Sequence, residues 1–117
     1  LQQPPGGHRY TTDDLLTAYI SSLQPPGPHV DLGCGNGSVL IAYNYLTKNK
    51  HKALGVEARK EAVGLTKASA IYNGITSNVT AKNFDFRDAP TLKSHVNKSF
   101  GSSEINIVTG TPPYFTV

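Results

Sequence analysis

The chain has 117 residues, of which 38% are hydrophobic and 16% are charged, and it contains 11 glycines and a single cysteine. This size and composition predict one globular unit with a small core. No apolar run approaches the roughly twenty residues that cross a bilayer and no signal-peptide pattern opens the chain, so no membrane partner is predicted. The net charge of +3 and the pI near 9.1 suit a polyanionic partner without establishing one.

The first predicted element is a helix capped by Thr11 or Thr12, with Asp13 and Asp14 in its first turn. Its apolar residues recur at helical spacing and predict one apolar stripe that packs against the rest of the fold. The stripe consists of Leu15, Leu16, Tyr19, Ile20 and Leu23.

The next segment, residues 30–40, is an apolar strand that breaks into alternating glycines and restarts as a helix. Gly33, Gly35 and Gly37 let the backbone turn sharply and allow a ligand to touch it. The helix predicted at 38–47 aims its free N–H groups and positive end at this loop. The spacing is G-x-G-x-G, whereas dinucleotide-binding folds have G-x-G-x-x-G.

A short buried strand at 52–57 ends in Glu57, twenty residues after Gly37. Doubly wound folds place a carboxylate at this point to accept hydrogen bonds from two ribose hydroxyls. Because Glu61 already supplies a negative charge to the first turn of the helix predicted at 58–72, Glu57 is predicted to be the ribose ligand.

The glycine loop led by Asp31 resembles motif I of the class I S-adenosylmethionine-dependent methyltransferases. The resemblance implies that the loop wraps the amino-acid end of S-adenosyl-L-methionine. The implied cofactor contacts in this loop are Asp31, Gly33, Cys34, Gly35, Asn36 and Gly37.

The same resemblance assigns the end of a third strand, predicted at 79–86 from its alternating pattern. It implies that Asp85 accepts the adenine amino group of the cofactor and that Phe86 packs on the adenine ring. Asp88 is a rival for the amino contact, and the sequence does not decide between the two acids.

A fourth apolar strand leads into Thr111-Pro112-Pro113-Tyr114. Two adjacent prolines hold the backbone extended with exposed carbonyls, which suits a planar amino group that donates two hydrogen bonds. The tetrapeptide resembles motif IV of enzymes that methylate exocyclic amino groups, although threonine stands where that motif usually has Asn, Asp or Ser. The catalytic residues implied are Thr111 and Pro112 for the amino group, Pro113 for the backbone form, and Tyr114 for stacking on the substrate.

Residues 7–16 resemble the segment that precedes motif I in bacterial tRNA adenine-N6 methyltransferases. This resemblance places Arg9 and Tyr10 at the mouth of the active site. Arg59, Lys60 and Arg87 follow the second and third strands and are predicted at the ligand edge of the sheet, where they could meet RNA phosphates. The cluster of Lys48, Lys50, His51 and Lys52 precedes a strand and is predicted at the opposite edge.

The elements predict an α/β fold, a Rossmann-like parallel sheet with helices on both faces and right-handed crossovers. The resemblance makes it the N-terminal half, with the first four strands, of a seven-stranded methyltransferase fold. Residues 1–28 are predicted as helix and linker and 29–117 as the cofactor-binding core. The missing initial methionine and the end just after motif IV predict that the chain is a fragment, or that the remainder is disordered or supplied by another chain. The open sheet edge is expected to be an aggregation liability unless a partner chain covers it.

The single cysteine, Cys34, gives no disulfide and predicts a reducing compartment such as the cytoplasm. The four histidines are scattered without partner ligands, so no metal site is predicted. The resemblances together imply methyl transfer from S-adenosyl-L-methionine to an exocyclic amino nitrogen, N6 of adenine in RNA (tRNA). Two alternatives stay open: a protein-glutamine N5 methyltransferase, and a non-catalytic module that binds cofactor or another subunit.

Overall fold

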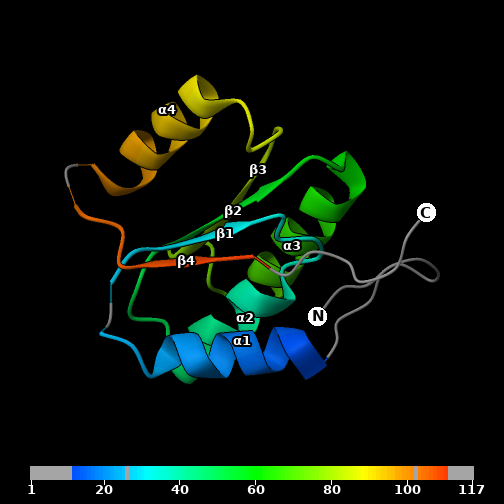
Figure 1. The fold of residues 1–117 in the computed structure, drawn as a ribbon. Coiled ribbons are helices and arrows are strands. Elements are labelled where there is room, and N and C mark those ends of the chain that lie inside the picture. The colour runs from blue at the N-terminus through cyan, green and yellow to red at the C-terminus, as the bar shows by residue number, and fades with distance from the viewer. Residues whose placement is uncertain (1–11, 26, 102, 111–117) are drawn as a thin grey trace.

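The computed structural model describes residues 12–25, 27–101 and 103–110 (Figure 1). The predicted order of elements is confirmed, and the helix between the third and fourth strands, predicted to be short, has 12 residues. The elements are α1 (Thr12–Ser22), β1 (His29–Leu32), α2 (Ser38–Leu46), β2 (Ala53–Glu57), α3 (Lys60–Tyr72), β3 (Val79–Asn83), α4 (Ala89–Phe100) and β4 (Ile107–Thr109).

The four strands form one parallel sheet in the order β3-β2-β1-β4. The chain steps outward from β1 to β2 and β3, and then returns to place β4 on the other side of β1. The strand order therefore reverses between β1 and β4. In open parallel sheets this switch point opens a crevice at the carboxyl ends of the strands, which is where ligands bind.

Helices cover both faces of the sheet, as predicted. Figure 1 shows α1 and α2 on one side and α4 on the other. On the first face Leu40 of α2 and Val63 of α3 pack with buried residues of β2 and β3, whereas on the second face Phe100 of α4 packs with Val30 and Leu54. The burial of every residue of β2 follows from this three-layer arrangement.

The predicted packing stripe of α1 is wrong. All five of its side chains are exposed: Leu15 (44%), Leu16 (51%), Tyr19 (53%), Ile20 (57%) and Leu23 (65%). The helix buries Asp14, Ala18 and Ser21 instead, and Ala18 packs against α2 and β4. Small side chains at 18 and 21 let the helix approach α2 closely, and the Ser38 hydroxyl donates to the Asp14 carboxylate over 2.8 Å. Close packing and this hydrogen bond fix the rotation of α1, and the stripe is left outside.

Within the described residues β4 is an edge strand, as predicted, and Val108 on it is 62% exposed. A groove of about 330 Å³ runs between this edge and α1, lined by residues that include Ile20, Pro25 and Val108. Nothing in the described part of the chain forms a helix that is long and apolar enough to span a membrane.

Candidate functional site

The loop after β1 has the backbone form that its glycines predict. Gly33, Gly35 and Gly37 all have left-handed φ angles, of 76°, 57° and 87°. At Gly37 a side chain is also excluded by space, since a Cβ atom there would lie 2.8 Å from Cγ2 of Thr66 on α3. The loop therefore packs against α3 at Gly37, a position that only glycine can occupy.

Neighbouring elements hold this loop in place. The Gly33 and Cys34 N–H groups both donate to the Val56 carbonyl, over 2.8 and 3.0 Å, and the Thr66 hydroxyl donates to the Gly35 carbonyl over 3.1 Å. The Cys34 side chain is buried against Gly55, and this contact explains why a small side chain stands at position 34. Burial raises the pKa of Cys34 to about 12, so this cysteine stays a neutral thiol.

Glu57 ends β2 beside the loop and is only 7% exposed. Its Oε1 atom accepts the Gly35 N–H over 3.0 Å, and its Oε2 atom accepts the Arg59 N–H over 2.7 Å. The Arg59 guanidinium also donates to Oε2 from Nε, over 3.2 Å. The carboxylate is thus oriented by the backbone; Oε1 keeps a lone pair for a hydroxyl donor, and Oε2 would gain one if the Arg59 side chain turned away.

Asp31 lies at the carboxyl end of β1 and is fully buried. Its Oδ1 atom accepts the Thr109 hydroxyl over 2.8 Å, whereas its Oδ2 atom has no hydrogen-bond partner among the described residues. Burial raises the pKa of Asp31 to about 6; the Thr109 hydrogen bond opposes this rise, and the charges of Asp14 and Glu57 add to it. A buried carboxylate oxygen without a partner is costly, which indicates a site for a donor.

Asn36, in the same loop, is 4% exposed. Its Oδ1 atom accepts the Ser38 N–H over 3.3 Å at the start of α2, but its Nδ2 atom has no partner in the described part of the chain. Among the described residues, the end of β1 thus holds a buried unpaired acceptor, on Asp31, and the loop after it a buried unpaired donor, on Asn36.

The acids after β3 differ in their contacts. The third strand ends at Asn83, so Asp85 and Phe86 lie in the following loop rather than in the strand, and Phe86 is 43% exposed. Asp85 forms an exposed ion pair with Arg87 (2.6 Å), and these hydrogen bonds lower the pKa of Asp85 to about 2. Its rival Asp88 caps α4, where it accepts the Thr91 N–H and hydroxyl.

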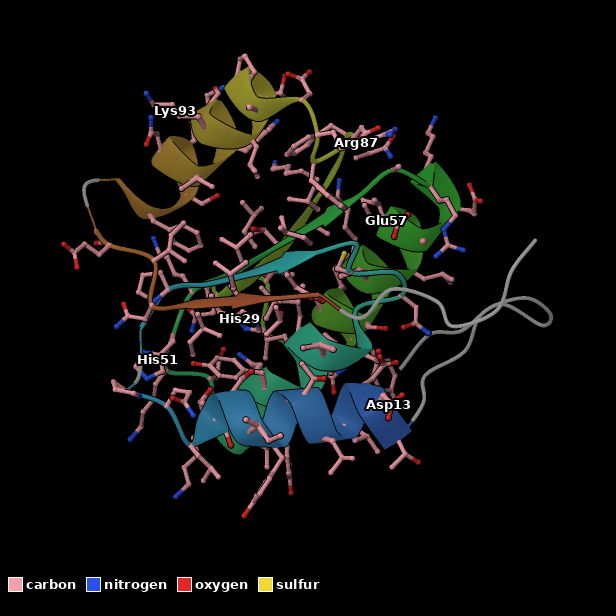
Figure 2. All side chains as sticks on the ribbon, in the orientation of Figure 1. Asp13, His29, His51, Glu57, Arg87 and Lys93 are labelled. Carbon is pink, nitrogen blue, oxygen red and sulfur yellow. The ribbon has the colours of Figure 1, made fainter. Side chains whose placement is uncertain are left out.

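Figure 2 shows Glu57 and Arg87 at one end of the sheet and His51 at the other. The predicted separation of the two basic groups is confirmed, since the 48–52 cluster lies in the turn before β2 and Arg59 and Lys60 follow β2. Both arginines of the ligand edge are held by acids two residues before them. The sequence-predicted residues Arg9, Tyr10, Thr111, Pro112, Pro113 and Tyr114 lie outside the described residues.

Several polar residues of this site escaped the sequence reasoning: Asp14, His29, Ser38, Thr66 and Thr109. His29 and Asp31 are two residues apart on β1 and therefore share a face of the sheet, and Thr109 is the register partner of Asp31 on β4. The sequence would have placed these three side chains together if the β1–β4 pairing had been known. Asp14 and Thr66 carry no comparable local signal.

No protein-family model matches the chain. A probable cobalt-precorrin-6B C(15)-methyltransferase (decarboxylating) of Saccharolobus solfataricus is 28% identical over 92 residues, covering 77% of this chain and 45% of the relative. The chain therefore spans about half the length of the curated relative it matches.

Solved methyltransferase structures are similar to the model. The SAH-bound methyltransferase PaMTH1 of Podospora anserina has a TM-score of 0.68 at 14% identity, with 86% of this chain and 40% of that chain covered. The C-terminal domain of precorrin-6Y C5,15-methyltransferase from Rhodobacter capsulatus has a TM-score of 0.60 at 18% identity, with 76% and 46% covered. The described residues thus have the Rossmann-like fold of class I methyltransferases, as the sequence predicted.

Proposed function

We propose that this chain binds S-adenosyl-L-methionine in the loop after β1, and that the protein transfers the methyl group to an exocyclic amino nitrogen, N6 of adenine in RNA. The observation that carries the cofactor proposal is a pair of buried atoms that are unpaired among the described residues, Asp31 Oδ2 near the end of β1 and Asn36 Nδ2 in the loop that follows. They offer an acceptor and a donor beside a backbone cradle at the switch point of the sheet.

The chemistry of these groups fits the two ends of the cofactor. An ionised Asp31 suits the ammonium of the methionine end, and the Asn36 amide suits its carboxylate. The Glu57 carboxylate, oriented by two backbone N–H groups, suits the ribose hydroxyls. The relative from Saccharolobus solfataricus, which is named as a methyltransferase, and PaMTH1, which has SAH bound, support the same cofactor.

The amino-nitrogen proposal rests on the motif that follows β4. Thr109 pairs with Asp31 across the switch point, and the described chain ends at Gly110, directly before Thr111 in sequence. An acceptor oxygen at Thr111 and the Pro112 carbonyl would orient an amino group toward the sulfonium methyl, while Tyr114 stacks on the base.

When bound, S-adenosyl-L-methionine would supply an electrophilic methyl carbon with S-adenosylhomocysteine as the leaving group, and the Thr111–Tyr114 motif would hold the amino nitrogen that takes the methyl. The nitrogen loses its proton after methylation. Orientation and electrostatics therefore carry catalysis, and this chain needs no strong general base.

RNA as the substrate is supported by position and charge. Arg59, Lys60 and Arg87 lie at the same edge as the glycine loop, and Lys60 is exposed. Because both arginines are paired with carboxylates, which reduces the free positive charge, the support comes from their position and from Lys60 more than from the arginine charges.

Methylation of carbon is the second candidate, and the relative from Saccharolobus solfataricus favours it. That protein's name gives a carbon of a precorrin as the methyl acceptor. The motif Thr111–Tyr114 favours nitrogen over carbon, because its hydrogen-bond acceptors suit an amino group and offer nothing to a carbon nucleophile.

Labelled S-adenosylmethionine, given to the full-length protein with an RNA pool, a protein pool and a reduced tetrapyrrole, tests these proposals. We expect N6-methyladenine in RNA, lost in Tyr114→Ala and largely kept in the matched control Tyr114→Phe. Label on a protein glutamine or on a tetrapyrrole carbon would overturn the RNA assignment. Cofactor binding without transfer to any of the three would leave the protein a cofactor-binding module.

A further inference from the structure

A chain of three side chains runs through the interior behind the glycine loop. The His29 Nε2 atom lies 2.7 Å from the Thr109 hydroxyl oxygen, which lies 2.8 Å from Asp31 Oδ1. His29 and Asp31 are fully buried, and His29 packs edge-on against Tyr43 with ring centroids 4.6 Å apart. The three residues come from β1 and β4, the strands that border the switch point. Their series of hydrogen bonds ends at Asp31, the proposed contact of the ammonium group.

The hydrogen bonds of His29, Thr109 and Asp31 can run in two directions, depending on whether the Asp31 carboxyl is protonated. With Asp31 ionised, the Thr109 hydroxyl donates to the carboxylate and accepts from His29 Nε2–H. With Asp31 protonated, its O–H donates to Thr109, whose hydroxyl then donates to His29 Nε2, and the imidazole proton lies on Nδ1. Both arrangements satisfy Thr109 fully, because a hydroxyl donates one hydrogen bond and accepts others.

The surroundings keep the imidazole neutral in either arrangement. Burial lowers the pKa of His29 to about 4, and its Nδ1 atom has no partner among the described residues. The charged groups that act on the Asp31 carboxyl are Asp14 from α1 and Glu57 from β2, and the Thr109 hydroxyl donates to it from β4. The negative charges of the two acids disfavour ionisation of the Asp31 carboxyl. A cation that binds at Oδ2 would therefore favour its ionised form strongly.

We propose that Thr109 is a positioning residue that couples the tautomer of His29 to the charge of Asp31, so that capture of the cofactor's ammonium group sets the direction of the whole hydrogen-bond chain. This inference rests on the proposed cofactor. Thr109 turns Oδ1 inward and leaves Oδ2 for the ligand, and His29 supplies the N–H that keeps the Thr109 hydroxyl pointing at the carboxylate.

The coupling makes cofactor affinity depend on pH. Only the ionised carboxylate attracts the ammonium, and a carboxyl with a pKa of about 6 is about nine-tenths ionised at pH 7 and about one-tenth ionised at pH 5. The dissociation constant of S-adenosylhomocysteine should therefore rise about tenfold between pH 7 and pH 5. In Thr109→Val the hydrogen bond that lowers the pKa of Asp31 is gone, so the midpoint of this profile should move to higher pH.

Calorimetric titration of the full-length protein with S-adenosylhomocysteine from pH 5 to pH 7.5 measures this profile. Thr109→Ser should keep the wild-type midpoint and Thr109→Val should raise it, whereas His51→Gln, in the turn at the far edge, should match the wild type. A loss of affinity in Thr109→Val that is equal at every pH would mean a merely structural role and would overturn the proposal.

Nitrogen-15 NMR of the His29 ring supplies a readout that does not depend on the cofactor. In the free protein the proton should move from Nδ1 at pH 5 to Nε2 at pH 7.5, and S-adenosylhomocysteine at pH 6 should drive it to Nε2. If His29 keeps one tautomer at every pH, the proposed coupling between His29 and Asp31 is overturned, even if Thr109→Val fails to fold. Absence of any binding at pH 7.5, with the tautomer change present, would refute the cofactor while leaving the coupling in place.

Discussion

The ends of β2 and β3 carry the same local pattern, an acid followed two residues later by arginine. Glu57 accepts the Arg59 N–H and its Nε–H, and Asp85 accepts the same two groups of Arg87. The difference lies in what else each acid touches. Glu57 is 7% exposed and also accepts the Gly35 N–H, whereas Asp85 is solvent-exposed at its ion pair and, among the described residues, makes hydrogen bonds within its own turn only.

This comparison shows that one local turn can serve two purposes. Beside the β1 loop the acid joins two segments of the chain, because it accepts from Gly35 in that loop as well as from Arg59 in its own turn. At the end of β3, one strand further from the switch point, the same turn is a surface feature. The four predictions that follow test this contrast, beginning with the largest expected effect.

The loop that Glu57 joins should tolerate no added methyl group at Gly37. Gly37→Ala meets both a left-handed backbone and the Thr66 side chain, so we expect a loss of about 2–4 kcal/mol in the free energy of unfolding. The matched control Gly74→Ala has a similar φ of 68° but open space, and should lose only about 1–2 kcal/mol. Denaturant unfolding measures both, and equal losses would mean that the contact with α3 is not tight.

Removal of the two acids should separate their roles in ligand binding. Glu57→Ala should weaken S-adenosylhomocysteine binding by on the order of 1–3 kcal/mol, because a charge-assisted contact to the ribose is lost. Asp85→Ala should cost less, because that carboxylate is exposed and already paired with Arg87. Calorimetry on both variants decides the matter, and a larger loss in Asp85→Ala would reverse the assignment.

The two carboxyls should also differ in titration. The Arg87 hydrogen bonds lower the pKa of Asp85 to about 2, so the stability that its ion pair contributes is present above the unfolded pKa near 3.8 and is lost as pH falls toward 2. Because the pair is exposed, we expect added salt to move the pKa of Asp85 back toward 3.8. Carbon-13 NMR titration at two salt concentrations tests this, with Arg87→Gln as the control that should raise the pKa at both.

The smallest effects should come from the arginines themselves. Arg59→Ala and Arg87→Ala should each weaken RNA binding modestly and flatten its salt dependence by at most about one unit of slope. Lys50→Ala, at the opposite edge of the sheet, serves as the control and should leave the slope unchanged. Binding titrations over a range of salt concentrations measure the slopes, and a larger change in the Lys50 variant would place the RNA elsewhere.

Much of the fold could be predicted because its signals are local. The alternating glycines and the acid at the end of β2 each act within a few residues, and the structure confirms the left-handed turns and the end of the strand. The end of β3 was misjudged, since the alternation continues to Phe86 in the sequence. In the structure Phe84 instead stacks on His95 of α4, with ring centroids 4.8 Å apart, and the chain turns there.

The rest depends on contacts that no local pattern contains. The rotation of α1 is set by Ala18 and by the Asp14–Ser38 hydrogen bond, which joins residues 24 positions apart. The Asp31–Thr109 contact spans 78 positions and needs the β1–β4 register to become visible. A hydrophobic stripe shows that one face of a helix is apolar. Which face the helix buries depends on the elements packed against it.

The central claim is that the β1 loop holds S-adenosylmethionine and not a dinucleotide. Competitive calorimetry of the full-length protein at pH 7.5, with S-adenosylhomocysteine against NAD⁺, tests it most directly. The account predicts one S-adenosylhomocysteine site, abolished or strongly weakened in Gly35→Asp and unaffected by NAD⁺. Binding of NAD⁺ in its place, or unchanged S-adenosylhomocysteine affinity in Gly35→Asp, would contradict it.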